Sequence, residues 1–424
     1  MAAAPVSERA PAQRIRTPRE AYLLFAGLFL SVASNNLVTP LLPSIRDDLG
    51  VTVTAIGVYV SAYGMARLVV DLPSGALMVR LGPRRTVLLG VTLNTLASAT
   101  AIFATDFRVL LAARICAGVG AGFLATVILT AMSDVAPAEI RGRVMSFYQV
   151  ANNLGIALYP LAGGALGVVF GWRAGFVAAT VAAIGSGLVL RPVMARIGLL
   201  QAEQAEQAEQ AERAGRQAHE PPAETGSSRR ALWLALGIVF FGVVANMINR
   251  HGFRNTVMPL FASSRLGLDG VQIATGITVM SLTGILVTIP AAALGDRIGR
   301  TRIIVFGLTV LGLGDLLFAV LATNYLTYLV AGTVIGLGDC FSSSQTAQLA
   351  GMVDRRRRSM VLASYRFFVD VGALLGPLGL AWVYGRFGSS AAVDTAGVIL
   401  LVAAGVALAG ARRLSPRAPV AVAQ

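Results

Sequence analysis

Apolar runs of about 20 residues recur along almost the whole chain, and no other feature constrains its fold as much. Each run is long enough to cross the ~30 Å hydrocarbon core of a bilayer as a helix. Only helices and closed barrels satisfy every backbone amide in lipid, and continuous apolar runs favour helices. With 13% charged residues, the chain has too few charges to cover a water-facing surface. We therefore expect an all-α membrane protein.

The runs predict twelve transmembrane helices in two groups of six. The predicted spans are 20–43, 54–79, 85–104, 109–132, 143–168, 174–194, 231–260, 270–293, 302–322, 326–350, 359–384 and 391–411. The expected domains are a tail (1–19), a first bundle (20–194), a linker (195–230), a second bundle (231–411) and a tail (412–424). The linker contains QAEQAEQAEQAE, which is helix-prone but too polar for lipid.

The arginines predict the orientation of the chain. All 35 basic residues are arginine. If the N-terminus is inside, 25 of them lie in cytoplasmic segments and 5 in outer loops. Cytoplasmic loops of membrane proteins carry this excess, so both termini are expected in the cytoplasm, with the protein in a bacterial inner membrane. Because the arginines lie in short loops between spans, we do not expect nucleic acid as a partner.

The two halves of the chain repeat at an offset of 217 residues. Four residues around the second predicted span and four around the fifth recur in the second half: Pro73, Arg80, Gly82 and Arg85 as Pro290, Arg297, Gly299 and Arg302, and Val144, Tyr148, Gly155 and Pro160 as Val361, Tyr365, Gly372 and Pro377. Matches at one offset across distant segments predict two pseudo-symmetric six-helix bundles. In secondary transporters a substrate site lies between such repeats.

A loop motif rich in glycine and arginine occurs once in each half of the chain. Its residues are Gly75, Leu77, Arg80, Gly82, Arg84 and Arg85 after the second span, and Leu294, Asp296, Arg297, Gly299, Arg300 and Arg302 in the second half. They resemble the pattern G-x-L-x-D-R-x-G-R-R of the major facilitator superfamily. The resemblance implies the twelve-helix fold of that family, with gating roles for these loops. In the first copy, Val79 replaces the family's acid, which helps to hold the cytoplasmic side closed.

Two charged pairs inside the spans offer a substitute for that acid. Arg67 and Asp71 lie four residues apart in the second span, and Arg366 and Asp370 do so in the eleventh. Residues at this spacing share a helix face. The resemblance implies that these helices meet across the cytoplasmic half, where Asp71 with Arg366 and Arg67 with Asp370 would form a lock between the bundles. The alternative is that each pair is satisfied within its own helix.

Two further stretches resemble motifs of the same family. Arg114, followed by Gly118 and Gly120, is similar to an arginine-glycine motif associated with proton coupling. Arg114 is therefore a candidate for coupling or for binding a substrate anion, and a purely structural arginine is the alternative. The fifth span is similar to an exporter-associated motif through Gly155, Pro160, Gly163 and Gly164, with Tyr159 in place of a glycine.

The resemblance implies that helices 1, 4, 7 and 10 line a central cavity. Polar side chains in these spans, and Tyr159 of helix 5, are the substrate candidates: Asn35, Asn36, Arg114, Tyr159, Asn246, Arg250, Asp339 and Ser343. Asp339 is expected to take up the coupled proton, with Asp315 as a rival and a fixed salt bridge to a cavity arginine as the alternative. Arg254 shares the face of Asn246 and Arg250 at a spacing of four, and the alternative places Arg254 and His251 at the outer mouth of helix 7. Arg114 and Arg250 favour substrates with a carboxylate or another electron-rich group.

These features predict a secondary transporter, not an enzyme. The chain has no phosphate-binding GxxxxGK[ST] loop, so a proton gradient is the expected energy source. It has no lysine, and its two histidines lie far apart, so no cofactor and no metal are expected. The expected partners are the lipid bilayer, protons and a small-molecule substrate, and the chain is expected to be a monomer. We expect proton-coupled efflux of a drug or metabolite. The alternatives are a proton-coupled importer and a transporter-like sensor that moves nothing.

Overall fold

The computed structural model describes residues 19–135, 141–213, 229–342, 345, 348–349 and 355–410. Within these residues the chain is helical and contains no strand. The elements in chain order are α1 (Arg19–Asn36), the 3-10 helix η1 (Thr39–Leu41), α2 (Leu42–Asp48), α3 (Val53–Leu81), α4 (Pro83–Ile102), α5 (Phe107–Val135), α6 (Arg141–Phe170), α7 (Arg173–Arg213), α8 (Arg229–Met247), the π-helix η2 (Ile248–Val257), α9 (Met258–Leu266), α10 (Gly270–Ile298), α11 (Arg300–Leu321), α12 (Tyr325–Ser342), α14 (Arg355–Phe387) and α15 (Ser389–Ala409).

These elements form twelve rods in the described chain, as predicted. The first rod joins α1, η1 and α2, because Pro40 and Pro43 stand at the first positions of new helices. The seventh joins α8, η2 and α9. Ten rods have the length and hydropathy to cross a membrane, and α4 and α12 complete the two sets of six. The protein is thus a multi-pass membrane protein.

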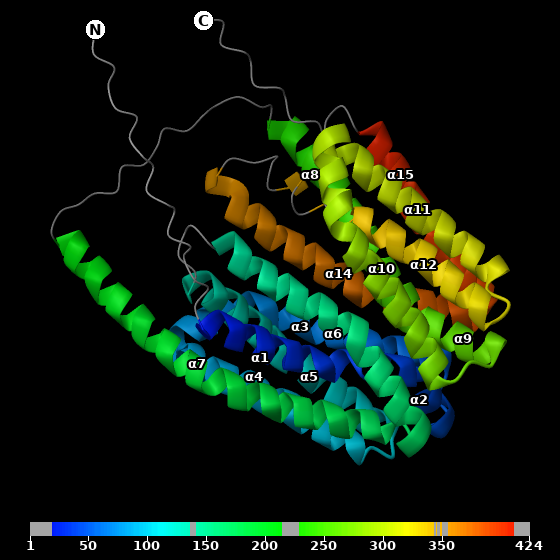
Figure 1. Ribbon diagram of the computed structural model, residues 1–424, viewed down its shortest axis with the longest axis horizontal. Coiled ribbons are helices and arrows are strands. Elements are labelled where there is room, and N and C mark those ends of the chain that lie inside the picture. Colours follow the sequence, from blue (N-terminus) through cyan, green and yellow to red (C-terminus); the bar gives the residue numbers. More distant parts are fainter. Residues whose placement is uncertain are drawn as a thin grey trace, which may run out of the picture.

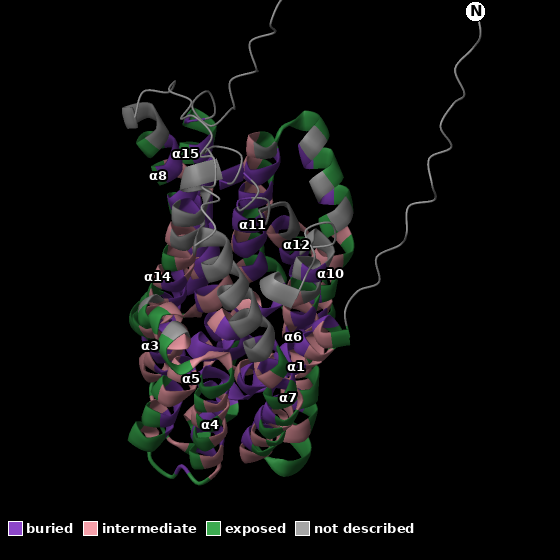
Figure 2. Cartoon of the chain, turned by 90° about the vertical axis from the view of Figure 1, so that its left-hand side faces the viewer, coloured by how far each residue is buried: buried purple, intermediate pink, exposed green. Residues whose placement is uncertain are grey.

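Apolar side chains on the outer faces of the bundles support this assignment. Leu188, Leu286 and Val320 are each more than 70% exposed. Exposed residues follow the outside of the helices, whereas buried residues gather between them (Figure 2). Large apolar patches are rare on water-soluble monomers, but lipid tails accept them without cost.

The 217-residue repeat corresponds to matching turns in the two bundles. Gly82 connects α3 to α4 with a backbone φ of +79°, and Gly299 connects α10 to α11 with a φ of +98°. Glycine enters this region without the steric cost that a Cβ atom imposes. The two prolines of the second landmark, Pro160 and Pro377, both lie inside helices, α6 and α14.

The two bundles meet along two helix pairs, α3 with α14 and α6 with α10 (Figure 1). Ser61 Oγ donates to the carbonyl of Leu374 at 2.7 Å, and Thr278 Oγ1 donates to that of Ala157 at 2.7 Å. A Cβ on Gly64 would lie only 3.2 Å from the backbone of Ala373. All these contacts lie in the halves of the helices away from the start of α1 and the end of α15. We call that side the contact end, and the side with the start of α1 the terminal end.

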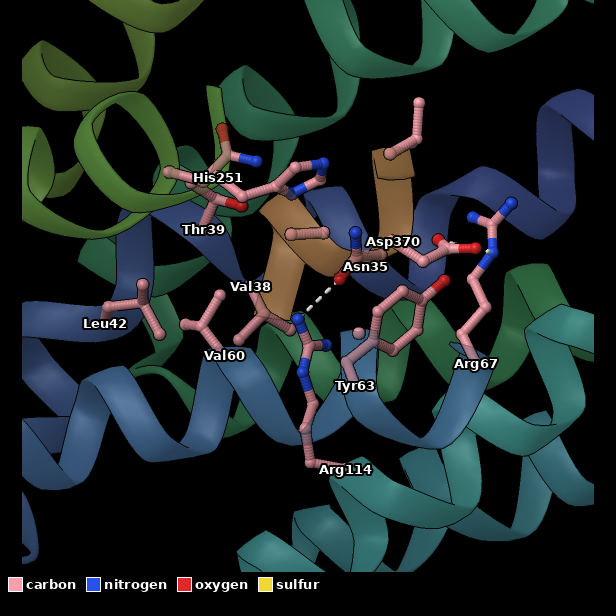
Figure 3. A pocket seen from close by; sticks show the side chains of 14 residues that line it. Asn35, Val38, Thr39, Leu42, Val60, Tyr63, Arg67, Arg114, His251 and Asp370 are labelled. Atoms are coloured by element: carbon pink, nitrogen blue, oxygen red, sulfur yellow. Dashed lines mark hydrogen bonds and ion pairs between the residues drawn. The ribbon is translucent and has the colours of Figure 1, made fainter. Parts of the chain in front are cut away.

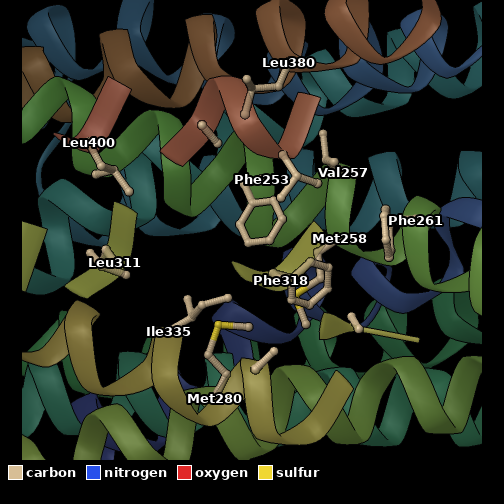
Figure 4. Packing of buried hydrophobic residues seen from close by; sticks show 14 of the residues in the cluster. Phe253, Val257, Met258, Phe261, Met280, Leu311, Phe318, Ile335, Leu380 and Leu400 are labelled. Carbon is tan, nitrogen blue, oxygen red and sulfur yellow. The ribbon is translucent and has the colours of Figure 1, made fainter. Parts of the chain in front are cut away.

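The second bundle has an aromatic core that fixes the π-helix. Phe253 of η2 packs edge-on against Phe318, with the ring centroids 5.4 Å apart (Figure 4). Tyr328 extends the stack and donates its hydroxyl hydrogen to the carbonyl of Ile273. These rings are fully buried, so they anchor η2 on the side away from the first bundle.

The segment predicted as a linker begins as a helix. α7 continues without a break from its membrane span through the QAE repeat to Arg213, and α8 starts at Arg229. In Figure 1 the end of α7 projects past the first bundle at the terminal end.

The glycines of the exporter-like motif sit at close approaches, and one of them gives a test of the packing. A Cβ on Gly163 would collide with the backbone carbonyl of Leu37. We expect Gly163→Ala to lower the free energy of unfolding by about 1–3 kcal/mol through overpacking. Gly405→Ala is the matched control, because no atom lies within 4 Å of its Cβ position. Thermal unfolding in detergent compares the two variants, and equal midpoints would contradict the packing.

Candidate functional site

A cavity of about 310 Å³ lies between the bundles, on the terminal side of their contacts. Residues of α1, α3, α5, α6, η2 and α14 form most of its wall. Helices 1, 4 and 7 were predicted there and contribute as α1, α5 and η2. The prediction for helix 10 was wrong for the described part of α12, none of whose residues lines the cavity. Asp339 of α12 instead lies behind Arg254 of η2.

Arg114 stands at the inner end of the cavity among aromatic rings (Figure 3). Its Nη2 donates to Asn35 Oδ1 at 2.5 Å, and its Cζ lies 4.9 and 4.7 Å from the ring centroids of Tyr59 and Tyr63. Such distances allow cation–π attraction. The side chain is only 8% exposed and its Nε has no hydrogen-bond partner. The neighbouring candidate Asn36 also lines the cavity and donates to the carbonyl of Val32.

The π-helical segment η2 determines which residues of helix 7 reach the cavity. Arg250, His251, Arg254 and Asn255 line it. The prediction that Asn246 lines the cavity was wrong: this side chain is buried in α8, outside the cavity wall. The prediction used the α-helical spacing of four, whereas hydrogen bonds in a π-helix span five residues and rotate the following side chains. His251 and Arg254 line the cavity, so the structure does not place them at the outer mouth, which was the alternative for these two residues.

Two aspartates lie behind η2 in the second bundle. Asp339 forms an ion pair with Arg254 at 3.0 Å, which is the alternative that the sequence left open for this carboxylate. Asp315 of α11 is fully buried and accepts a hydrogen bond from the amide of Asn249, a residue of η2. Asn249 was not recognised from the sequence. The sequence feature that could have identified Asn249 is its polar amide directly before Arg250, inside a predicted membrane span.

The charged pairs of helices 2 and 11 meet near the middle of their helices. Arg67 Nε lies 3.6 Å from Asp370 Oδ1 and 3.7 Å from Asp71 Oδ2. The expected position in the cytoplasmic half was wrong, because α3 and α14 touch at the contact end and their ion pair marks the edge of that contact. No ion pair between described residues joins Asp71 to Arg366, and Arg366 lines the cavity. Whether Arg67 and Asp370 act as a lock stays a prediction.

The remaining candidates fall outside the cavity. Tyr159 does not line it, and packs on Phe29 with 4.9 Å between the ring centroids. Gly75 does not mark a close approach, because no atom lies within 4 Å of its Cβ position. Arg80 and Arg297 are exposed next to the turn glycines. Ser343 and the side chain of Asp296 lie outside the described part of the chain.

A double-mutant cycle tests the pairing of Arg67 with Asp370. Because Asp370 is only 4% exposed, we expect Arg67→Gln and Asp370→Asn to couple by about 0.5–3 kcal/mol in thermal unfolding. The control cycle combines Asp106→Asn with Arg297→Gln, two exposed residues of different bundles that share no partner in the described chain, and should be additive within about 0.5 kcal/mol. If the effects of Arg67→Gln and Asp370→Asn are additive, the ion pair between the bundles does not contribute to stability.

Comparison with known proteins agrees with this architecture. The sequence profile of the Major Facilitator Superfamily matches residues 24–274 and 239–423. A chloramphenicol resistance protein of Streptomyces lividans is 35% identical over 42% of this chain and 46% of its own length. A multidrug resistance protein of Bacillus subtilis is 22% identical over 84% of this chain and 86% of its own. The crystal structure of a peptide transporter superposes with a TM-score of 0.77 at 17% identity, over 94% of this chain and 95% of the other. The chain belongs to the Major Facilitator Superfamily.

Proposed function

We propose that the protein exports a small organic molecule, drug or metabolite, by alternating access driven by inward proton flow. The observation that carries the proposal is the cavity between two bundles that touch only on one side of it in the described chain. A rocking motion that separates the contact end and joins the terminal end would expose the same residues to the other side of the membrane.

The direction of transport rests on orientation and on relatives. The arginine distribution favours cytoplasmic termini in a bacterial inner membrane, so the cavity would face the cytoplasm and load from it. Relatives whose names refer to chloramphenicol, multidrug and quinolone resistance favour export of drug-like molecules. An importer is the second candidate. A probable L-galactonate transporter of Escherichia coli, 30% identical over 42% of this chain and 39% of its own length, favours a metabolite as the substrate.

Asp339 is the proposed proton carrier, acting through its ion pair with Arg254. Protonation of the carboxylate would remove the charge that holds Arg254 at 3.0 Å. The guanidinium would then be free to turn towards the cavity that it lines. Proton binding behind η2 would thereby change the charge presented to a substrate in front of it. We propose that a single chain carries out this cycle as a monomer.

Flux in proteoliposomes tests the proposal. With an imposed pH gradient, the wild type should move chloramphenicol or a quinolone uphill in exchange for protons. Asp339→Asn should abolish uphill transport but keep downhill exchange, because an amide cannot take up and release the proton. Asp394→Asn, which changes an exposed carboxylate on α15, is the matched control and should behave as wild type.

Each other outcome overturns a specific part of the proposal. If Asp339→Asn keeps uphill transport and Asp315→Asn loses it, the proton carrier is the buried carboxylate of α11. If a compound moves together with protons, the protein is an importer. If the protein binds a compound at equilibrium but moves none, it is a sensor.

A further inference from the structure

The cavity is surrounded by more positive than negative side chains. Five arginines line the cavity or its inner end: Arg67, Arg114, Arg250, Arg254 and Arg366. Three aspartates pair with these or stand beside them: Asp71, Asp339 and Asp370. Two positive charges are therefore left without a counter-charge among the described residues of the cavity. Uncompensated charge at the depth of a membrane is costly, and such residues usually serve a ligand.

Arg114 is one of three cavity arginines, with Arg250 and Arg366, that form no ion pair with a described residue. The aspartate ion pairs of the described chain account for Arg67 and Arg254, but Arg114 has only Asn35 and the two tyrosine rings as partners. The rings and the amide keep water from the guanidinium without neutralising it. Its Nε, in a side chain more than nine-tenths buried, donates to no described atom. Arg114 therefore retains both a charge and a hydrogen-bond donor for a ligand.

A small chamber adjoins this arginine at the inner end of the cavity. It measures about 60 Å³, and a water molecule in the liquid takes up about 30 Å³, so it holds a group of two or three heavy atoms. Arg114, Asn35 and Tyr63 line it from the first bundle, and His251 and Asn255 from η2 of the second (Figure 3). Imidazole and amide groups can donate hydrogen bonds, so donors face the chamber from both bundles. Asp370 also borders it but pairs with Arg67.

We propose that this chamber binds the carboxylate of an amphipathic organic anion. The larger cavity next to it presents apolar side chains, among them Leu28, Val32, Leu124 and Met247, which would cover the hydrocarbon part of the same molecule. A planar guanidinium matches a carboxylate in shape and charge. Because the chamber takes donors from both bundles, a bound carboxylate would also connect the two moving halves. The inference rests on the proposed function and specifies the substrate class of that site.

Equilibrium binding to the full-length protein in lipid nanodiscs tests the proposal by calorimetry. The probes are benzoate, 2-naphthoate and indole-3-acetate, each beside its neutral carboxamide. We expect at least one acid to bind tenfold or more tightly than its amide. Arg114→Gln should remove that preference while leaving the amide affinity within twofold, which also reports that the variant is folded. Arg108→Gln, an exposed arginine six residues earlier in α5, is the matched control.

A second variant comes from the other bundle. His251→Gln should weaken the acid at least threefold, because the chamber takes a donor from η2. The proposal is overturned if no acid binds more tightly than its amide, or if Arg114→Gln and His251→Gln both keep the preference. A protein that carries out proton-driven transport in liposomes but shows no preference for acids would retain the proposed function and lose only this inference.

Discussion

The close contact of α3 with α14 and of α6 with α10 determines the rest of the architecture. Lipid supplies no hydrophobic drive between helices, so such contacts depend on small residues and on hydrogen bonds between hydroxyls and backbone carbonyls. Small residues and such hydrogen bonds both occur between the two bundles. Gly64 and Gly164 bring backbones together, and Ser61 and Thr278 reach across to carbonyls of the other bundle. Because these contacts lie on one side of the membrane centre, a cavity remains on the other side.

The ion pairs of the site lie where this contact ends. Arg67 and Asp370 belong to different bundles, so their attraction holds only while the contact end stays closed. Arg254 and Asp339 belong to the same bundle and fix the cavity-lining helix to a helix behind it. The first pair therefore responds to the relative position of the bundles. In the proposed mechanism the second would respond to protons and to charge in the cavity, so the first pair would follow the movement of the bundles and the second the coupling.

Much of this arrangement is already present in the sequence. Apolar runs predict the rods, and the repeat offset predicts the two turns at Gly82 and Gly299, because glycine identity and position together require a particular backbone. Arg67 and Asp370 were predicted as partners because the resemblance to the family implies that the second and eleventh helices meet, and both helices carry an arginine and an aspartate four residues apart. Their depth was predicted wrongly, since depth depends on which side of the transporter is closed. The sequence pattern alone does not state on which side the two bundles are in contact.

The π-helix was not predictable in this way, and it organises the second half of the site. Periodicity arguments assume 3.6 residues per turn, so they placed Asn246 on the cavity face together with Arg250 and Arg254. The ten-residue segment η2 supplies side chains that line the inner chamber. It also supplies the partner of Asp339 in an ion pair and the hydrogen-bond donor to Asp315. Phe253, from the same segment, is fixed in the aromatic core of the bundle. One short element thus connects the cavity to the carboxylates of Asp315 and Asp339, and any rotation of it would change all three contacts together.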